Sequence, residues 1–184
     1  IGIVHAWFGR FSKAIASLNT AYDIFAGLSN YRAMIVCRAN LAEMYRHAGD
    51  YETSVEILTE TLQIGQDQDL PPATYGNVYN NRGMVLLLME EYELAEQDLK
   101  YAVHLLSENA HQSVREILES TRGLAELALV RGDYRDAWKH AEHAYRLANG
   151  KQTFMNLVEV YLTMAHIAAQ YPDAPETANV HYQK

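Results

Sequence analysis

The sequence predicts an all-α fold, a right-handed solenoid of stacked antiparallel helix hairpins. Three observations favour this fold. A short aromatic motif occurs four times at nearly constant spacing along the 184 residues. Amphipathic helical periodicity lies on both sides of each copy, without strand-like alternation. Hydrophobic residues make up 49% of the chain, which is enough for a continuous core.

The repeated motif carries an aromatic residue and small residues at fixed offsets. The aromatic positions Phe11, Tyr51, Tyr92 and Tyr134 are 40, 41 and 42 residues apart. A small residue follows three positions later and another precedes by nine, at Ala14, Ser54, Ala95 and Ala137 and at Gly2, Ala42, Gly83 and Ala125. Small side chains allow paired helices to cross closely. We therefore expect Gly83 and Ala125 to be buried at helix crossings.

The turn before each aromatic residue also has a physical explanation. Gly49 and Gly132 suit a left-handed helix C-cap, and Asp50 and Asp133 can cap the following helix. The third copy has Glu90-Glu91 instead, so we expect its turn to lack the glycine cap.

Helix start and stop signals give a coarse map. The expected helices lie near residues 12–27, 30–48, 51–65, 71–89, 92–107, 111–131, 134–148 and 152–170, with prolines 71 and 72 in the first turn of the fourth. One repeat domain follows, with a partial unit 1–28, complete units 29–69, 70–110 and 111–150, and a partial unit 151–184. We interpret the chain as a fragment of a longer protein whose exposed ends fray or self-associate.

Composition excludes several functional classes. The net charge of −8 disfavours nucleic-acid binding through this segment. The longest apolar run, residues 84–89, is too short to span a bilayer, and no signal peptide is visible. Cys37 is the single cysteine, lies in an apolar helical stretch and is expected to be a buried thiol. A cytoplasmic location is the expectation.

The repeated columns resemble the tetratricopeptide repeat family along essentially the whole chain. The best matches are Leu41, Ala42, Tyr45, Gly49, Tyr51, Ser54 and Leu58 in the second unit, Gly83, Leu86, Tyr92, Ala95, Leu99 and Ala102 in the third, and Leu124, Ala125, Ala128, Gly132, Tyr134, Ala137 and Ala144 in the fourth. The period exceeds the family's usual 34 residues, and the proline that commonly ends a unit is absent. Longer repeats of this kind resemble those of bacterial regulators, such as peptide-pheromone receptors and signalling ATPases, and of kinesin light chains.

The resemblance implies a concave groove lined by the first helix of each unit. Groove positions carried over from the family are Asn40, Glu43, His47, Asn77, Asn80, Asn81, Met84, Arg122 and Glu126. Asn77, Asn80 and Asn81 lie one helical turn apart, and their amides suit an extended peptide or, alternatively, local backbone partners. In the peptide reading, alanine at Asn80 or Asn81 weakens binding and leaves the fold unchanged. Arg122 could bind a ligand carboxylate or pair with Glu119 or Glu126.

No catalytic or metal-binding pattern stands out. His140 and His143 lie one turn apart, but the sequence indicates no third ligand, so a solvated helix face is the simpler interpretation. Phosphate loops and nucleophile elbows are absent. We expect no enzyme activity, cofactor or metal.

The leading functional hypothesis is a protein- or peptide-binding scaffold or sensor. Its expected context is the regulatory repeat region of a larger bacterial signalling or transcription-regulating protein. The alternative is a structural or oligomerisation arm without a peptide ligand of its own.

Overall fold

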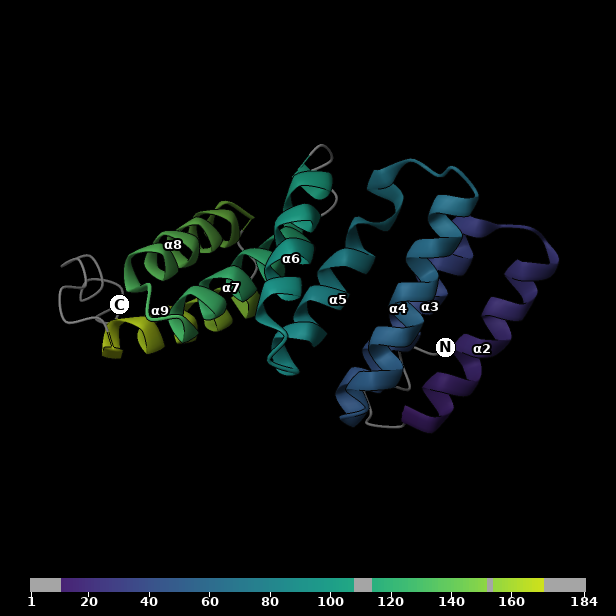
Figure 1. Ribbon diagram of the computed structural model, residues 1–184, viewed down its shortest axis with the longest axis horizontal. Helices are drawn as coiled ribbons and strands as arrows, with labels where there is room; N and C mark the ends of the chain where they lie inside the picture. Colours follow the sequence, from purple (N-terminus) through teal and green to yellow (C-terminus); the bar gives the residue numbers. More distant parts are fainter. Residues whose placement is uncertain (1–10, 108–113, 152–153, 171–184) are drawn as a thin grey trace. The chain divides into compact units, whose positions relative to one another are not determined.

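The computed structural model describes residues 11–107, 114–151 and 154–170, and helices occupy nearly all of them (Figure 1). These described residues contain no β-strand. The chain forms two compact units, residues 1–105 and 106–184, which are described separately below. The predicted all-α fold is thus confirmed.

The first unit contains consecutive antiparallel helices. They are α2 (Phe11–Gly27), α3 (Tyr31–Ala48), α4 (Tyr51–Asp67), the short 3-10 helix η1 (Pro72–Tyr75), α5 (Gly76–Leu88) and α6 (Tyr92–Ser107), whose last two residues fall in the second unit. Helix α3 packs against α2 and α4, and α5 packs against α4 and touches α3 (Figure 1).

The expected single helix over residues 71–89 is wrong at its start. Neither Pro71 nor Pro72 has an amide hydrogen to donate, and the first turn closes instead with an i→i+3 bond from Thr74 N to Pro71 O of 2.8 Å. The resulting 3-10 turn places Tyr75 against Gly65 of α4, where an added Cβ would lie 2.7 Å from Tyr75 Cδ1. The break therefore packs the Tyr75 ring, which is buried, onto α4.

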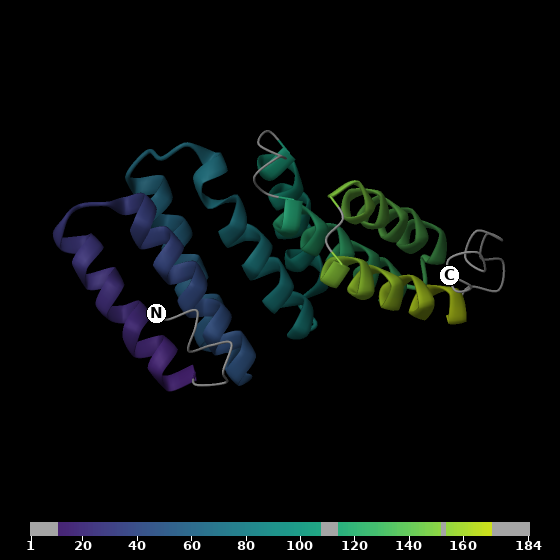
Figure 2. The same cartoon turned by 180° about the vertical axis from the view of Figure 1, so that it is seen from behind.

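The second unit contains α7 (Val114–Val130), α8 (Tyr134–Lys151) and α9 (Phe154–Gln170). Helices α7 and α8 form a hairpin, and α9 packs against both of them (Figure 2). Its core includes Leu118, Trp138 and Ile167, one from each helix. The division of the chain into repeat units stays a prediction.

Small residues lie at the helix crossings, as predicted. Ala14, Ser54, Ala95 and Ala137 are fully buried, and so are Ala42 and Ala125. Gly83 is also buried, and a Cβ there would lie 2.8 Å from Leu99 Cγ of α6. Ser54 Oγ donates to Ala42 O at 2.8 Å, so this small polar residue is satisfied inside the core.

The turn of the third repeat lacks glycine, as predicted, yet its backbone has the same conformation as the other two turns. Glu90 adopts a left-handed φ of 63°, close to the 82° of Gly49 and the 75° of Gly132. Its amide donates to Leu87 O at 3.2 Å, and the Glu91 amide donates to Leu86 O at 2.9 Å. The same two-bond C-cap therefore forms without glycine.

Candidate functional site

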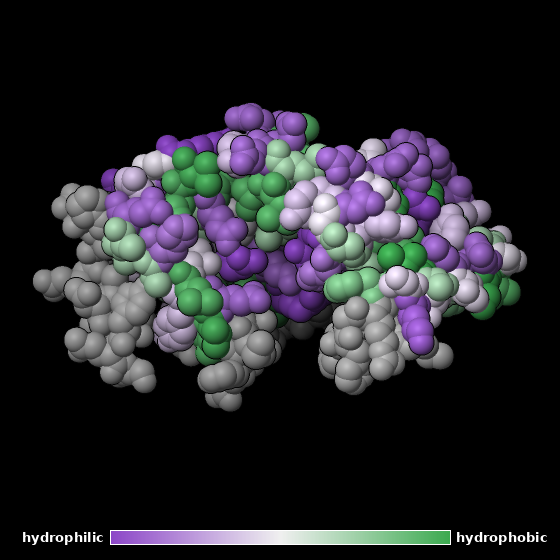
Figure 3. Space-filling view, turned by 90° about the horizontal axis from the view of Figure 1, so that it is seen from below, coloured by the Kyte–Doolittle hydropathy of each residue, from purple (hydrophilic) through white to green (hydrophobic). Residues whose placement is uncertain are grey.

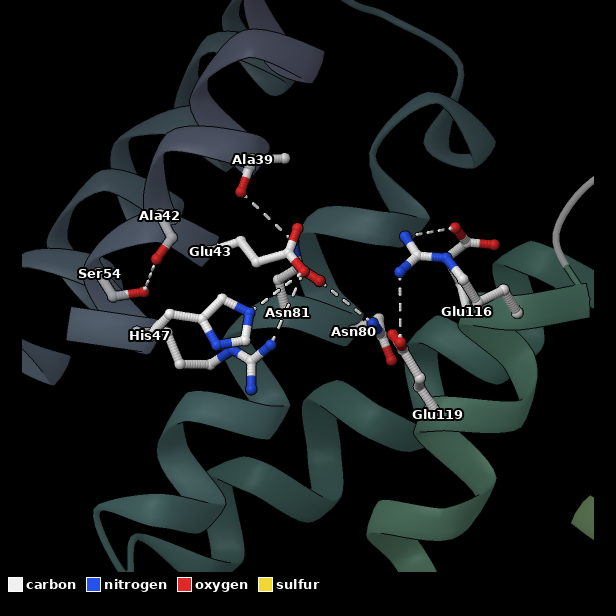
Figure 4. A network of polar contacts seen from close by, with 11 residues as sticks. Ala39, Ala42, Glu43, His47, Ser54, Asn80, Asn81, Glu116 and Glu119 are labelled. Carbon is white, nitrogen blue, oxygen red and sulfur yellow. Dashed lines mark hydrogen bonds and ion pairs between the residues drawn. The ribbon is translucent and has the colours of Figure 1, made fainter. Parts of the chain in front are cut away.

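Two of the three predicted groove asparagines tie helices together in the first unit. Asn80 is fully buried, and its Nδ2 donates to Asn81 Oδ1 at 3.2 Å. Asn81 Nδ2 donates in turn to Ala39 O of α3 at 3.4 Å (Figure 4). The expectation that Asn80 lies outside the core is therefore wrong. Asn80 lies on the face of α5 that is buried in the first unit. Asn81 has a backbone partner as well, but on the neighbouring helix α3 and not on its own helix.

The other predicted residues of α3 and α5 are half-buried or exposed. Asn40, Asn77 and Met84 are half-buried, and the buried Asn77 Oδ1 has no hydrogen-bond partner among the described residues. Glu43 lies 3.8 Å from Arg46 and 3.7 Å from His47, each measured to Glu43 Oε1 (Figure 4). Glu43 and His47 thus belong to a local polar cluster on the last turns of α3.

A groove in the second unit lies between α7 and α9. Its volume is about 500 Å³. We call it the α7–α9 groove; its walls are formed by Arg122, Glu126, Leu129, Val130, Glu159, Leu162, Thr163 and His166. The groove lies between α7, the first helix of its hairpin, and α9, the helix that begins the next predicted unit. The repeat pattern predicts a ligand-binding surface at this position.

The polar end of the groove holds one guanidinium between two carboxylates. Arg122 Nη1 pairs with Glu126 Oε1 one helical turn away, and Arg122 Nε lies 3.9 Å from Glu159 Oε2 of α9. The buried Arg122 Nε makes no hydrogen bond to any described residue. Glu159 keeps 54% of its side chain exposed, against 21% for Arg122. The intramolecular alternative for Arg122 is therefore the observed one.

The apolar part of the groove exposes large aliphatic side chains. Leu162 is 65% exposed and Val130 57% exposed, whereas Leu129 is buried beneath them. Hydrophobic side chains reach the molecular surface in separate patches among hydrophilic ones (Figure 3). Exposed aliphatic side chains in a hollow mark interaction sites more often than single ones on a convex surface.

The remaining polar groups of the groove already have partners on α9. Thr163 Oγ1 donates to Glu159 O at 3.1 Å, and His166 Nε2 lies 2.9 Å from Gln170 Nε2. Of these lining residues, the sequence pattern predicted Arg122 and Glu126 but none on the α9 wall. No aromatic motif of the repeated type follows α9, so its columns could not be aligned with the earlier units.

A smaller hollow of about 200 Å³ in the first unit is lined by residues of α4, α5 and α6. Its lining includes Arg82, which donates to both carboxylate oxygens of Asp98, from Nε at 2.6 Å and from Nη2 at 3.0 Å. Arg82 Nη1 also donates to Thr59 Oγ1 at 3.3 Å. The Asp98 hydrogen bonds raise the pKa of Arg82, which keeps this bridge charged.

The other chemical candidates, His140, His143 and Cys37, are paired or at least partly buried. His140 Nε2 lies 3.3 Å from Asp136 Oδ2, and burial lowers the pKa of His143. Burial also raises the pKa of the Cys37 thiol, as expected for a buried cysteine. In the described ranges, no three His, Cys, Asp or Glu side chains gather closely enough to hold a metal ion. No helix within those ranges is long and apolar enough to cross a membrane.

Comparison with known proteins places this geometry in a class. The sequence model of the Tetratricopeptide repeat family matches residues 1–67. No curated protein matches the chain in sequence. Solved structures with the same fold include the apo form of RapI, at a TM-score of 0.80 and 15% identity, covering 98% of this chain and 64% of RapI. The chain therefore spans somewhat less than two thirds of RapI.

Two further structures have the same fold at low identity. BtubC from P. vanneervenii has a TM-score of 0.72 at 19% identity, covering 97% of this chain and 75% of BtubC. A protein described as a kinesin light chain of Podosopora anserina, with nearly identical TPR-like repeats, has a TM-score of 0.67 at 16% identity, covering 99% and 85%.

These findings define an all-α helical-repeat protein with a groove between successive first helices. Residues 1–67 match the Tetratricopeptide repeat family, and the chain as a whole has the fold of TPR-repeat structures, as its repeated columns predicted. Repeats of this type are generally protein-interaction scaffolds and are typically non-catalytic.

Proposed function

We propose that this chain is a protein-binding module whose docking surface is the α7–α9 groove. The observation that carries the proposal is the exposure of Leu162 and Val130 in a groove of about 500 Å³. Burying those side chains against a partner removes apolar surface from water, at roughly 25 cal/mol per Å². The charged end of the groove orients that partner.

The first unit offers a second, weaker surface for the same function. Asn40, Asn77 and Met84 are half-buried on α3 and α5, and Glu43 and His47 lie at the end of α3. The unpartnered Asn77 Oδ1 supports contact with a ligand donor there.

The wider context belongs to this proposal as well. In this proposal the chain is the regulatory repeat region of a larger bacterial signalling protein and acts in the cytoplasm. The repeat period of 40 to 42 residues supports the regulatory role, because bacterial regulators have long repeats of this kind. Self-association through the repeat ends is the competing role, as a structural arm without a ligand.

The test uses peptides selected from a displayed random library on the immobilised 184-residue chain. The affinity of a selected peptide is then measured for the parent chain and for Leu162→Ser, with Leu28→Ser as the matched control. Leu28 is 70% exposed and lies outside the groove, in the first unit. We expect Leu162→Ser to weaken binding about tenfold and Leu28→Ser to change it less than about twofold.

Equal effects of the two substitutions would overturn the groove as the docking surface. So would a selection that enriches no peptide. In that second case, a stable dimer in sedimentation velocity would favour the structural arm.

A further inference from the structure

The α7–α9 groove has an excess of negative charge beside its exposed aliphatic side chains. Arg122 is already paired with Glu126, so among the described residues the Glu159 carboxylate has only the 3.9 Å contact to Arg122 Nε. Glu159 is also the most exposed of the three charged side chains. Because the whole chain carries −8, the long-range field reinforces this local excess.

This charge pattern selects against an acidic ligand. A carboxylate entering the groove would meet Arg122 only by displacing Glu126, and it would lie beside Glu159. A cationic side chain instead gains Glu159 as a partner and disturbs no existing pair. Each exposed pair contributes little alone, but like charges that meet across an interface are strongly disfavoured.

The residues that line the groove also indicate which backbone conformation a ligand can have there. An extended peptide needs side chains that replace the water on its N–H and C=O groups, and Asn or Gln serve that role best. The eight described lining residues include neither, and Thr163 and His166 already bond within α9. A helix satisfies its own backbone, so it can enter this groove without that loss.

The placement of aliphatic side chains on both walls of the groove suits a helical ligand. Val130 and Leu129 come from α7 and Leu162 from α9, so apolar surface is offered on both walls. Side chains three and four residues apart on a helix form one stripe that can lie between two such walls.

We propose that the α7–α9 groove binds a basic amphipathic helix, with leucine-like side chains between Val130 and Leu162 and a Lys or Arg reaching Glu159. This assignment rests on the proposed function and specifies its ligand.

The experiment uses three designed peptides and fluorescence anisotropy with the full chain. The first is an alanine-based helix with leucines at positions i, i+3, i+4 and i+7 and lysines on either side of that stripe. The second has glutamate at every lysine position. The third has the first sequence with two of its leucines in the D configuration, which breaks the helix.

The key variant is Glu159→Lys, because this exposed side chain can be reversed in charge without disturbing the core. Glu56→Lys is the matched control, since Glu56 is exposed on α4 and outside the groove. We expect the lysine helix to bind at least about tenfold more tightly than the other two peptides. Glu159→Lys should weaken the lysine helix about tenfold and strengthen the glutamate helix, whereas Glu56→Lys should change each less than about twofold.

Tighter binding of the glutamate helix to the parent chain would overturn the charge assignment. Equal binding of the helix-broken peptide would overturn the helical one, and binding of none of the three would overturn both. Failure of the proposed function would look different: Leu162→Ser would leave the affinity of every binding peptide unchanged.

Discussion

Glu90 holds a backbone conformation that usually belongs to glycine. A left-handed residue with a side chain costs about 1–2 kcal/mol because Cβ crowds the following carbonyl oxygen. The two C-cap hydrogen bonds that this conformation forms in the turn between α5 and α6 offset the strain. The matching turns use Gly49 and Gly132, so among these three turns only that of Glu90 has a left-handed residue with a side chain.

Replacing Glu90 by Gly should therefore stabilise the chain. We expect Glu90→Gly to raise the free energy of unfolding by about 1 kcal/mol in urea denaturation, because glycine adopts positive φ without strain. Gly132→Ala, the reverse change at the matching turn, should lower it by a similar amount. No gain in Glu90→Gly would show that the glutamate conformation is unstrained.

Asn80 is predicted to contribute to stability. Its side chain is fully buried and donates to Asn81, so Asn80→Ala removes a buried hydrogen bond and leaves a small cavity. The expected loss is about 1–3 kcal/mol by thermal or urea unfolding. Asn40→Ala, at a half-buried position of α3, should cost less than about 0.5 kcal/mol. Unchanged unfolding of Asn80→Ala would restore it as a surface residue.

The contrast between Asn80 and Arg122 shows how far residue roles follow from sequence. The two occupy the same column, twelve residues before Tyr92 and Tyr134. Helical period fixes which residues share a face, but burial also depends on how closely the next helix approaches. That distance is set by side chains far along the chain, so the column predicted a groove for both and was wrong for Asn80.

Among the helices, α4, α5 and α6 are joined by one charged bridge. Arg82 of α5 donates to both oxygens of Asp98 in α6 and to Thr59 in α4. Asp98 is only 8% exposed in its side chain, so Arg82 takes the place of water around its carboxylate. Nothing in the sequence spacing indicated the pair, since the residues lie sixteen apart across a turn.

Removing either partner of this bridge should be costly. We expect Arg82→Ala and Asp98→Ala each to destabilise the fold by about 2–4 kcal/mol, because a nearly buried charge is left alone. The double substitution should cost clearly less than the sum, with a coupling of about 1 kcal/mol or more. Additive losses in urea unfolding would mean that the two side chains act independently.

Across the whole molecule, the repeat period carried most of the information about the fold. The four aromatic motifs predicted where α2, α4, α6 and α8 begin. Within the described residues, the expected helix limits agree with the observed ones to within a few residues, except at the prolines before α5. The groove was predicted from one wall only. Its other wall is α9, whose unit has no aromatic motif of that type to align, so Glu159 and Leu162 had no sequence signal.

Methyl NMR of the full chain tests the central claim most directly. Leucine and valine methyls are labelled, and a library-selected peptide is titrated. We predict the largest chemical-shift changes at Leu129, Val130 and Leu162 of the α7–α9 groove, with Leu28 and Leu94 nearly unmoved although both are exposed. Largest changes at Leu28 or Leu94, with the groove methyls unmoved, would contradict the assignment of the groove as the binding surface.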